Sequence, residues 1–168
     1  MAKDYFIADT HFGGENIRRY ENRPFANAQE MDEKLIENWN SVVTDEDTVY
    51  VLGDFSDYAD AKKETEILGK LNGTKVLVMG NHDTHRTPHE WREIGFTECF
   101  PMPVIYKNFF MLSHEPLYIN SNMPYANFYG HVHANPSYKD VCKQSVCVSV
   151  ERIDYTPVEF TILRAQMV

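Results

Sequence analysis

The chain has 168 residues, of which 43% are hydrophobic and 24% charged, and these values are typical of one globular domain. Its 16 basic and 25 acidic side chains give a formal net charge of −9, which disfavours extended nucleic acid as a partner. The three cysteines, Cys99, Cys142 and Cys147, are too few for a disulfide framework, and no apolar run approaches the ~20 residues of a membrane span. The N-terminus shows no signal-peptide pattern, so we expect a cytoplasmic protein with one domain over residues 1–168.

The first half of the chain alternates predicted strands and helices. Short apolar runs that stop at polar residues predict buried strands, and apolar residues at helical spacing predict helices. In chain order these are a strand over 5–8, a loop over 11–23, a helix over 26–43, a strand over 48–52, a helix over 60–71, a strand over 75–79 and a helix over 88–94.

The second half contains mainly strand signals. Runs rich in β-branched and aromatic residues predict strands over 104–106, 109–112, 127–129, 145–150 and 158–163, the first two as a hairpin. Strands and helices that alternate first, followed mainly by strands, predict an α/β sandwich with mixed sheets.

One pattern recurs five times: a short hydrophobic strand ends, and residues able to bind metal follow at once. α/β sheets place ligands beyond the carboxyl ends of their strands, so these segments should converge. Carboxylate, amide and imidazole groups without thiolate suit Mn²⁺, Fe or Zn²⁺, and their number suits two ions that clamp a phosphoryl group. The five segments are Asp9-Thr10-His11, Gly53-Asp54, Gly80-Asn81-His82-Asp83, Ser113-His114 and Gly130-His131-Val132-His133.

In this order the five motifs resemble those of the calcineurin-like metallophosphoesterase superfamily, from Asp9 to His133. The ending Val148-Ser149-Val150-Glu151 resembles the small bacterial and phage members, which lack a cap domain. The resemblance implies a four-layer αββα sandwich of two mixed sheets flanked by helices. It also implies two divalent metal ions, with Mn²⁺ expected and Fe, Zn²⁺ or Ni²⁺ also acceptable to these ligands.

The resemblance further implies a role for each motif residue. The first ion would be held by Asp9, His11 and His133, the second by Asn81, His114 and His131, and Asp54 would bridge the two.

By the same resemblance, a water or hydroxide between the ions would be the nucleophile. His82 would act as general acid or stabilise the transition state, and Asp83 would accept a hydrogen bond from His82 and fix its tautomer. Asn16 and Arg18, in the predicted loop after His11, are candidate substrate contacts.

Several functions remain open at this point. A missing cap favours a phosphodiester or a nucleotide-like substrate, with phosphomonoester hydrolysis as the alternative and a homodimer plausible. The metal motifs contain no arginine, which disfavours protein phosphatase activity, and Gly14 stands where small relatives often carry a histidine. A non-catalytic scaffold is a further alternative, but the complete ligand set and Asn81-His82 favour catalysis. An amidohydrolase is disfavoured because D-x-H comes first and H-x-H last.

Overall fold

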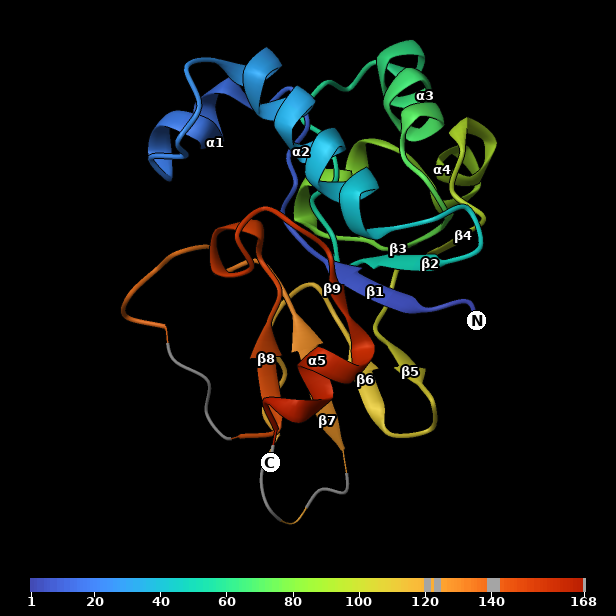
Figure 1. The fold of residues 1–168 in the computed structure, drawn as a ribbon, viewed down its shortest axis with the longest axis vertical. Helices are drawn as coiled ribbons and strands as arrows, with labels where there is room; N and C mark the ends of the chain where they lie inside the picture. Colours follow the sequence, from blue (N-terminus) through green and yellow to red (C-terminus); the bar gives the residue numbers. More distant parts are fainter. Residues whose placement is uncertain (120–121, 123–124, 139–142, 168) are drawn as a thin grey trace.

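The computed structural model describes residues 1–119, 122, 125–138 and 143–167, and its central feature is a pair of β-sheets (Figure 1). The first sheet has the strand order β4-β3-β2-β1-β9. Strands β1 to β4 are parallel, and β9 runs antiparallel to β1. These strands are β1 (Asp4–Ile7), β2 (Thr48–Val51), β3 (Thr74–Val78), β4 (Glu98–Phe100) and β9 (Val158–Glu159).

The second sheet has the order β5-β6-β7-β8. Strand β5 pairs antiparallel with β6, whereas β6, β7 and β8 are parallel. Both sheets are therefore mixed, and the predicted α/β fold of two mixed sheets with flanking helices is confirmed. The strands are β5 (Val104–Tyr106), β6 (Phe110–Leu112), β7 (Ala126–Tyr129) and β8 (Ser145–Cys147).

The helices lie mostly on one side of the first sheet. Figure 1 shows α1 to α4 on the side away from the second sheet, with α5 near the second sheet. No helix among the described residues is both long and apolar enough to cross a membrane. The helices are α1 (Glu15–Tyr20), α2 (Ala28–Val42), α3 (Ala61–Lys70), α4 (Pro88–Ile94) and α5 (Phe160–Ala165), with short 3-10 helices η1 (Asn81–His85) and η2 (Val150–Arg152).

Two hydrophobic cores hold these layers together. Successive side chains of a strand point to opposite faces. Tyr5 and Ile7 of β1 thus pack in the core beneath the helices, with Trp39 of α2. Phe6 packs in the core between the sheets, where its ring lies 5.0 Å from that of Phe128 in β7. Strand β1, which ends at the metal motif of Asp9, is therefore fixed from both faces.

Helix α1 lies inside the segment 11–23, so the prediction of a loop there is wrong. None of its side chains is buried, and no apolar period marks it in the sequence. It is held instead by Glu15, which pairs with Arg18 at 2.5 Å and Arg19 at 2.9 Å and accepts a 2.9 Å hydrogen bond from the Ala28 backbone. The charge spacing of three and four residues was the available signal.

The C-terminal strands are also shorter than predicted. The predicted strand over 158–163 forms β9 for two residues only and then becomes α5. Its β-branched and aromatic residues favour a strand, but Phe160 and Leu163, three positions apart, pack into the core between the sheets from a helix. The strand predicted over 145–150 ends at Cys147, and the short β4 was not predicted.

Candidate metal centre

The five motifs of the sequence come together where the two sheets meet. Asp9, Asp54 and Asn81 follow β1, β2 and β3 of the first sheet, while His114 and His131 follow β6 and β7 of the second. The carboxyl ends of parallel strands meet at one edge of a sheet. Two sheets thus contribute ligand atoms to one place.

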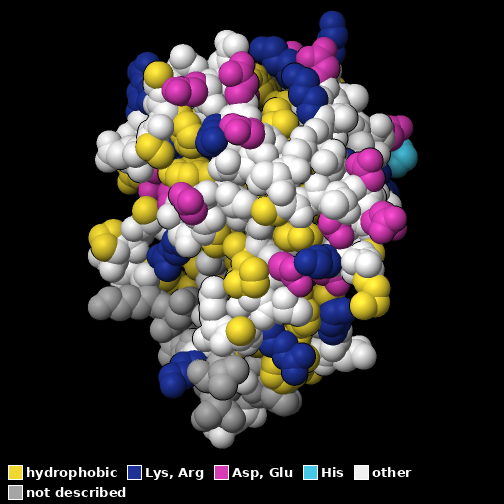
Figure 2. Space-filling view, in the orientation of Figure 1, with side chains coloured by type: hydrophobic (Ala, Val, Ile, Leu, Met, Phe, Trp, Pro, Cys, Tyr) yellow, Lys and Arg dark blue, Asp and Glu magenta, His cyan; other side chains and the backbone are white. Residues whose placement is uncertain are grey.

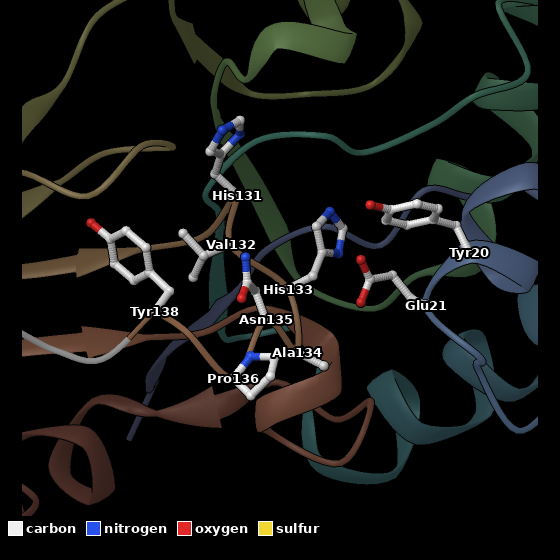
Figure 3. Close-up of a pocket in the computed structure, with 9 residues that line it drawn as sticks. All are labelled: Tyr20, Glu21, His131, Val132, His133, Ala134, Asn135, Pro136 and Tyr138. Carbon is white, nitrogen blue, oxygen red and sulfur yellow. The ribbon is translucent and has the colours of Figure 1, made fainter.

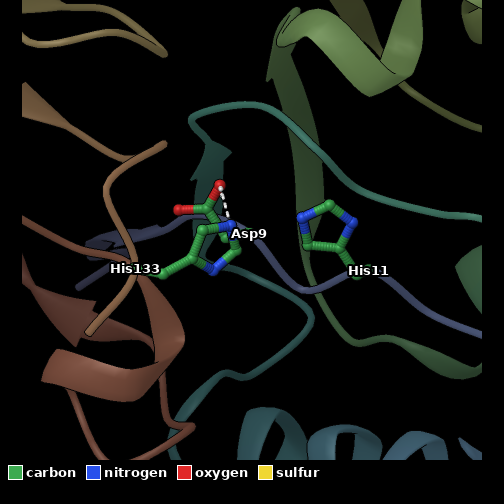
Figure 4. Close-up of side chains that lie close together, drawn as sticks. All are labelled: Asp9, His11 and His133. Carbon is green, nitrogen blue, oxygen red and sulfur yellow. Dashed lines mark ion pairs between the residues drawn. The ribbon is translucent and has the colours of Figure 1, made fainter. Parts of the chain in front are cut away.

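The first cluster consists of Asp9, His11 and His133, whose ligand atoms lie within 4.8 Å of one another. Figure 4 shows the contact between Asp9 Oδ1 and His133 Nε2, at 3.9 Å, with His11 beside it. Asp9 Oδ1 and His11 Nε2 are buried and have no hydrogen-bond partner among the described residues. Buried polar atoms without a partner are costly, and a bound cation would satisfy both of them.

Hydrogen bonds from neighbouring residues orient the ligand atoms of this first cluster. Asp9 Oδ2 accepts hydrogen bonds from Ser149 Oγ at 2.6 Å and from the His131 backbone N–H at 2.9 Å, which leaves Oδ1 for a cation. The Glu151 carboxylate lies 3.1 Å from His133 Nδ1 and accepts a bond from buried Arg23 at 2.8 Å. A carboxylate behind a histidine in this way fixes the ring so that its other nitrogen faces a metal.

The second cluster consists of Asp54, His114 and His131, again with ligand atoms within 4.8 Å of one another. Asn81 Oδ1 lies 3.0 Å from His114 Nε2 and 3.1 Å from His131 Nδ1, so it belongs to the same group. His114 Nδ1 lies 2.9 Å from the Leu52 carbonyl, which only accepts a hydrogen bond. Nδ1 therefore carries a proton, and Nε2 is the atom available to an ion.

Asp54 lies between the two clusters. Its Oδ2 is 3.5 Å from His11 Nε2 of the first cluster and 3.3 Å from His114 Nε2 of the second. Its Oδ1 accepts a 2.9 Å hydrogen bond from the His82 backbone N–H, which fixes the carboxylate. The structure thus brings together the seven residues predicted as ligands, with Asp54 in the central position predicted for it.

The short distance between Asp54 and His114 determines how the two side chains are protonated. Burial alone would raise the pKa of Asp54, but the hydrogen bond and charge of His114 lower it to about 2. Burial alone would lower the pKa of His114, but Asp54 raises it to about 9. Without metal, a proton on His114 therefore balances Asp54, and a cation would displace that proton.

His82 stands at the open side of the centre. Its side chain is 50% exposed, and its ring packs edge-on against His11 with centroids 4.9 Å apart. Its Nδ1 lies 3.4 Å from Asp57 Oδ1, which also lies 2.9 Å from His11 Nδ1. Asp57 therefore links the predicted acid to a predicted metal ligand.

The predicted hydrogen bond from His82 to Asp83 is wrong. Asp83 is completely buried, and its oxygens accept hydrogen bonds from the backbone N–H groups of Asp54, Phe55 and Gly80, at 2.7, 3.0 and 2.7 Å. Burial raises its pKa to about 6. Asp83 therefore shapes the backbone that carries Asp54, and Asp57 occupies the place beside His82 that the sequence prediction gave to Asp83.

The backbone of the site is strained. Asp9, His11, Asp54, His131 and His133 all have a positive φ, between 46° and 70°. Residues other than glycine rarely adopt this region, and such strain is concentrated at functional sites.

Glycine is required at two positions beside these ligands because a side chain there would collide with the ligand atoms. A Cβ on Gly53, whose φ is +89°, would lie 2.2 Å from His114 Nδ1, and one on Gly80 would lie 2.3 Å from Asp54 Oδ1.

Sequence reasoning missed Asp57 and Glu151 as parts of the site. Asp57 lies three residues after Asp54, and Glu151 lies directly after Val150 in the C-terminal segment that the sequence analysis had singled out. Neither follows a strand at once, and their contacts to histidines become visible only in the folded chain.

The two predicted substrate contacts differ in their surroundings. Asn16 lines a cavity of about 590 Å³ together with Asp57 and His82, and its role there stays a prediction. Arg18 lines neither of the two cavities beside the clusters, since its guanidinium is bound to Glu15 and to the Phe25 carbonyl. The structure therefore does not bring Arg18 to the site.

The remaining histidines and cysteines lie outside the ligand clusters. His85 contacts the buried Glu64 at 3.2 Å, and His89 pairs with Glu93 on exposed α4. Cys99 and Cys147 are buried free thiols, whereas Cys142 lies outside the described residues.

Comparison with known proteins gives a consistent result. The model of the calcineurin-like phosphoesterase family matches residues 5–159. An uncharacterized protein of Methanocaldococcus jannaschii is 41% identical over 169 residues, which cover 97% of this chain and 90% of that protein. The gene 66 protein of Mycobacterium phage L5 is 35% identical over 86 residues, 49% of this chain and 41% of that protein.

A solved structure is similar over nearly the full length. The crystal structure of a protein of unknown function from Aquifex aeolicus superposes with a TM-score of 0.77 at 29% identity. The match covers 98% of this chain and 99% of the Aquifex chain.

Proposed function

The chain belongs to the calcineurin-like phosphoesterase family, and on that premise we propose that it is a phosphodiesterase that works with two divalent cations. The observation that carries the proposal is the position of Asp54 between two ligand clusters. Asp9 Oδ1 and His11 Nε2 are buried and have no hydrogen-bond partner among the described residues, and a bound cation would satisfy both atoms.

The donor set supports the same assignment. Asp9, His11 and His133 would hold one ion, and Asn81, His114 and His131 the other, with Asp54 shared between them. When bound, two such cations supply a water of lowered pKa and offset the charge of the phosphate. Oxygen and imidazole ligands without thiolate suit Mn²⁺, which we propose as the ion.

His82 is the residue we assign to the leaving group. Its half-exposed imidazole can approach a substrate oxygen, and His82 belongs to neither of the two ligand clusters described above, although it forms a third group of possible metal ligands with His11 and Asp57. Asp57 lies close to both His82 Nδ1 and His11 Nδ1, so it orients the His82 ring. Proton donation to the departing oxygen would complete cleavage of the P–O bond.

Charge supports a diester over a monoester. A phosphate monoester carries close to two negative charges at pH 7, and sites that bind it commonly supply arginine. Neither of the two cavities beside the clusters is lined by lysine or arginine among the described residues. A diester carries only one negative charge, so it depends less than a monoester on cationic side chains beside the metal ions.

The surface supports a small substrate. The face of the molecule in Figure 2 shows lysine and arginine side chains scattered among acidic and neutral ones. Extended nucleic acid is bound by continuous basic surface, which this face does not present.

Hydrolysis of bis(p-nitrophenyl) phosphate and of p-nitrophenyl phosphate by metal-stripped protein, titrated with Mn²⁺, tests the proposal. We expect activity to appear as two ions bind per chain and to be greater on the diester. A preference for the monoester would show a phosphomonoesterase instead. Two bound ions with no turnover of either compound would favour a scaffold role, and absence of metal binding would overturn the proposal.

A further inference from the structure

Two cavities meet at the candidate metal centre. One, here called the His133 cavity, has a volume of about 680 Å³ and is lined by His131 and His133. The other, the His82 cavity, measures about 590 Å³ and is lined by Asp57 and His82. Tyr20 lines both cavities, and the buried His11 ring lies beside both centres, with its centroid 4.9 Å from that of His82 and 5.3 Å from that of His133.

The His133 cavity is built for an uncharged, flat group. Figure 3 shows Tyr20, the last residue of α1, and Glu21 directly after it projecting toward His133, opposite Val132 and Tyr138. The Tyr20 side chain is 81% exposed, so its ring is available to stack on a ligand.

The described lining of the His133 cavity disfavours a further phosphate. Its described lining contains the carboxylate of Glu21 and no lysine or arginine. The volume lies within the ~300–1,000 Å³ common for small-molecule sites. A nucleoside, with a planar base and an uncharged sugar, meets these conditions, whereas a polyphosphate does not.

On the basis of the proposed phosphodiesterase function, we propose that the substrate is a nucleoside phosphodiester whose nucleoside occupies the His133 cavity. The two substituents of a diester need two separate spaces, and the structure offers one on each side of His11. His82 lines the second cavity, so the alcohol that leaves is placed there and the nucleoside keeps the phosphate.

The chemical step balances as a hydrolysis. The oxygen of water forms a bond to phosphorus, and the bond from phosphorus to the alcohol oxygen in the His82 cavity breaks. That oxygen takes a proton from His82, and the proton lost by water leaves through solvent. The products are a nucleoside monophosphate and an alcohol.

The test uses two diesters with the same leaving group. Thymidine 5′-(p-nitrophenyl phosphate) and methyl p-nitrophenyl phosphate both release p-nitrophenol, so effects in the His82 cavity cancel in the ratio of their kcat/KM values. Stacking of a base on an aromatic side chain predicts a ratio of roughly ten or more in favour of the thymidine compound. A ratio near one would overturn the inference.

Variants test whether the preference for the thymidine compound arises in the His133 cavity. Tyr138→Ala, which changes the His133 cavity and not the His82 cavity, should lower the ratio by about fivefold or more. Tyr20 lines both cavities, so Tyr20→Ala should also lower the ratio, while its effect on the shared leaving group cancels. Tyr118→Ala is the matched control, because this tyrosine is 74% exposed and lines neither cavity. If both cavity variants keep the wild-type ratio, the nucleoside does not bind at Tyr20 and Tyr138, and the inference is wrong.

A binding measurement separates this inference from the proposed function. Calorimetric titration of the Mn²⁺-loaded protein should show tighter binding of thymidine 5′-monophosphate than of methyl phosphate, and Tyr138→Ala should reduce the difference. That result without hydrolysis of either diester would support the nucleoside site and refute the phosphodiesterase. Hydrolysis of both diesters at equal rates, with equal binding of both phosphates, would refute the nucleoside site alone.

Discussion

The two sheets contribute to the candidate metal centre in different ways. The first sheet brings both carboxylates and the amide, Asp9, Asp54 and Asn81, on short connections after parallel strands, together with His11. The second sheet brings only imidazoles, those of His114, His131 and His133, which follow β6 and β7.

Hydrogen bonds between the two sheets position the histidines of the second sheet beside the ligands of the first sheet. The Leu52 carbonyl lies 2.9 Å from His114 Nδ1, and Asp9 Oδ2 accepts a bond from the His131 backbone N–H. The first sheet thus supplies the negative charge and the bridging position, and the second sheet completes a site whose geometry the first has set. Substitutions in the first region should therefore have the larger effects.

The largest effect is expected for Asp54→Asn, which removes the charge shared by the two clusters. A metal ion provides several kcal/mol of transition-state stabilisation, so we expect kcat/KM on bis(p-nitrophenyl) phosphate to fall by roughly a thousandfold or more. Bound Mn²⁺, measured by elemental analysis, should fall below two per chain. Asp45→Asn, at an exposed position of the same region, is the control and should keep both. Full metal content and activity in Asp54→Asn would contradict the bridging role.

A smaller loss is expected for His82→Ala, which removes the proposed acid and leaves the two clusters intact. General acid catalysis contributes roughly 10²–10⁴-fold, and kcat should fall by that factor while two ions remain bound. His89→Ala is the control, because His89 is exposed on α4 and pairs only with Glu93 among the described contacts. Loss of metal in His82→Ala would show that this side chain has a different role.

Glycine substitutions compare the site with a surface helix. Gly53→Ala places a Cβ 2.2 Å from His114 Nδ1 at a positive φ, and backbone strain alone costs about 1–3 kcal/mol of the free energy of unfolding. Gly69→Ala, in α3, where no atom outside the neighbouring helix backbone lies within 4 Å of the new Cβ, should instead raise that free energy by about 0.5–1 kcal/mol. Urea denaturation of the metal-free proteins measures both changes, and equal stability of the two variants would contradict the argument.

The smallest effect is expected for the pH dependence of Mn²⁺ binding. The pKa of His114 in the metal-free protein is raised to about 9 by Asp54, so at pH 7.5 this histidine is protonated. An ion at Nε2 requires the neutral ring, and Mn²⁺ affinity should therefore rise with pH up to about 9 and then level off. Calorimetry in two buffers of different ionisation enthalpy measures the released proton. His114→Gln should reduce that release, and a wild-type protein that releases no proton would contradict the assignment.

The sequence alone was sufficient to predict the fold class and the residues that the structure brings together as candidate ligands. Each ligand motif follows a hydrophobic strand, and the strands before Asp9, Asp54 and Asn81 are short, buried runs in the first sheet. These local patterns predict the site because parallel strands are buried on both faces and end at a common edge of the sheet.

Only the tertiary structure decided which groups support those ligands. Asp83 is adjacent to His82 in sequence, but burial turns its carboxylate toward three backbone N–H groups, and Asp57 takes the place beside His82. Likewise, the run after residue 158 has strand-forming residues but becomes α5, since the core between the sheets takes Phe160 and Leu163. Hydrogen-bond partners and packing depend on contacts between distant segments, and local residue order does not encode them.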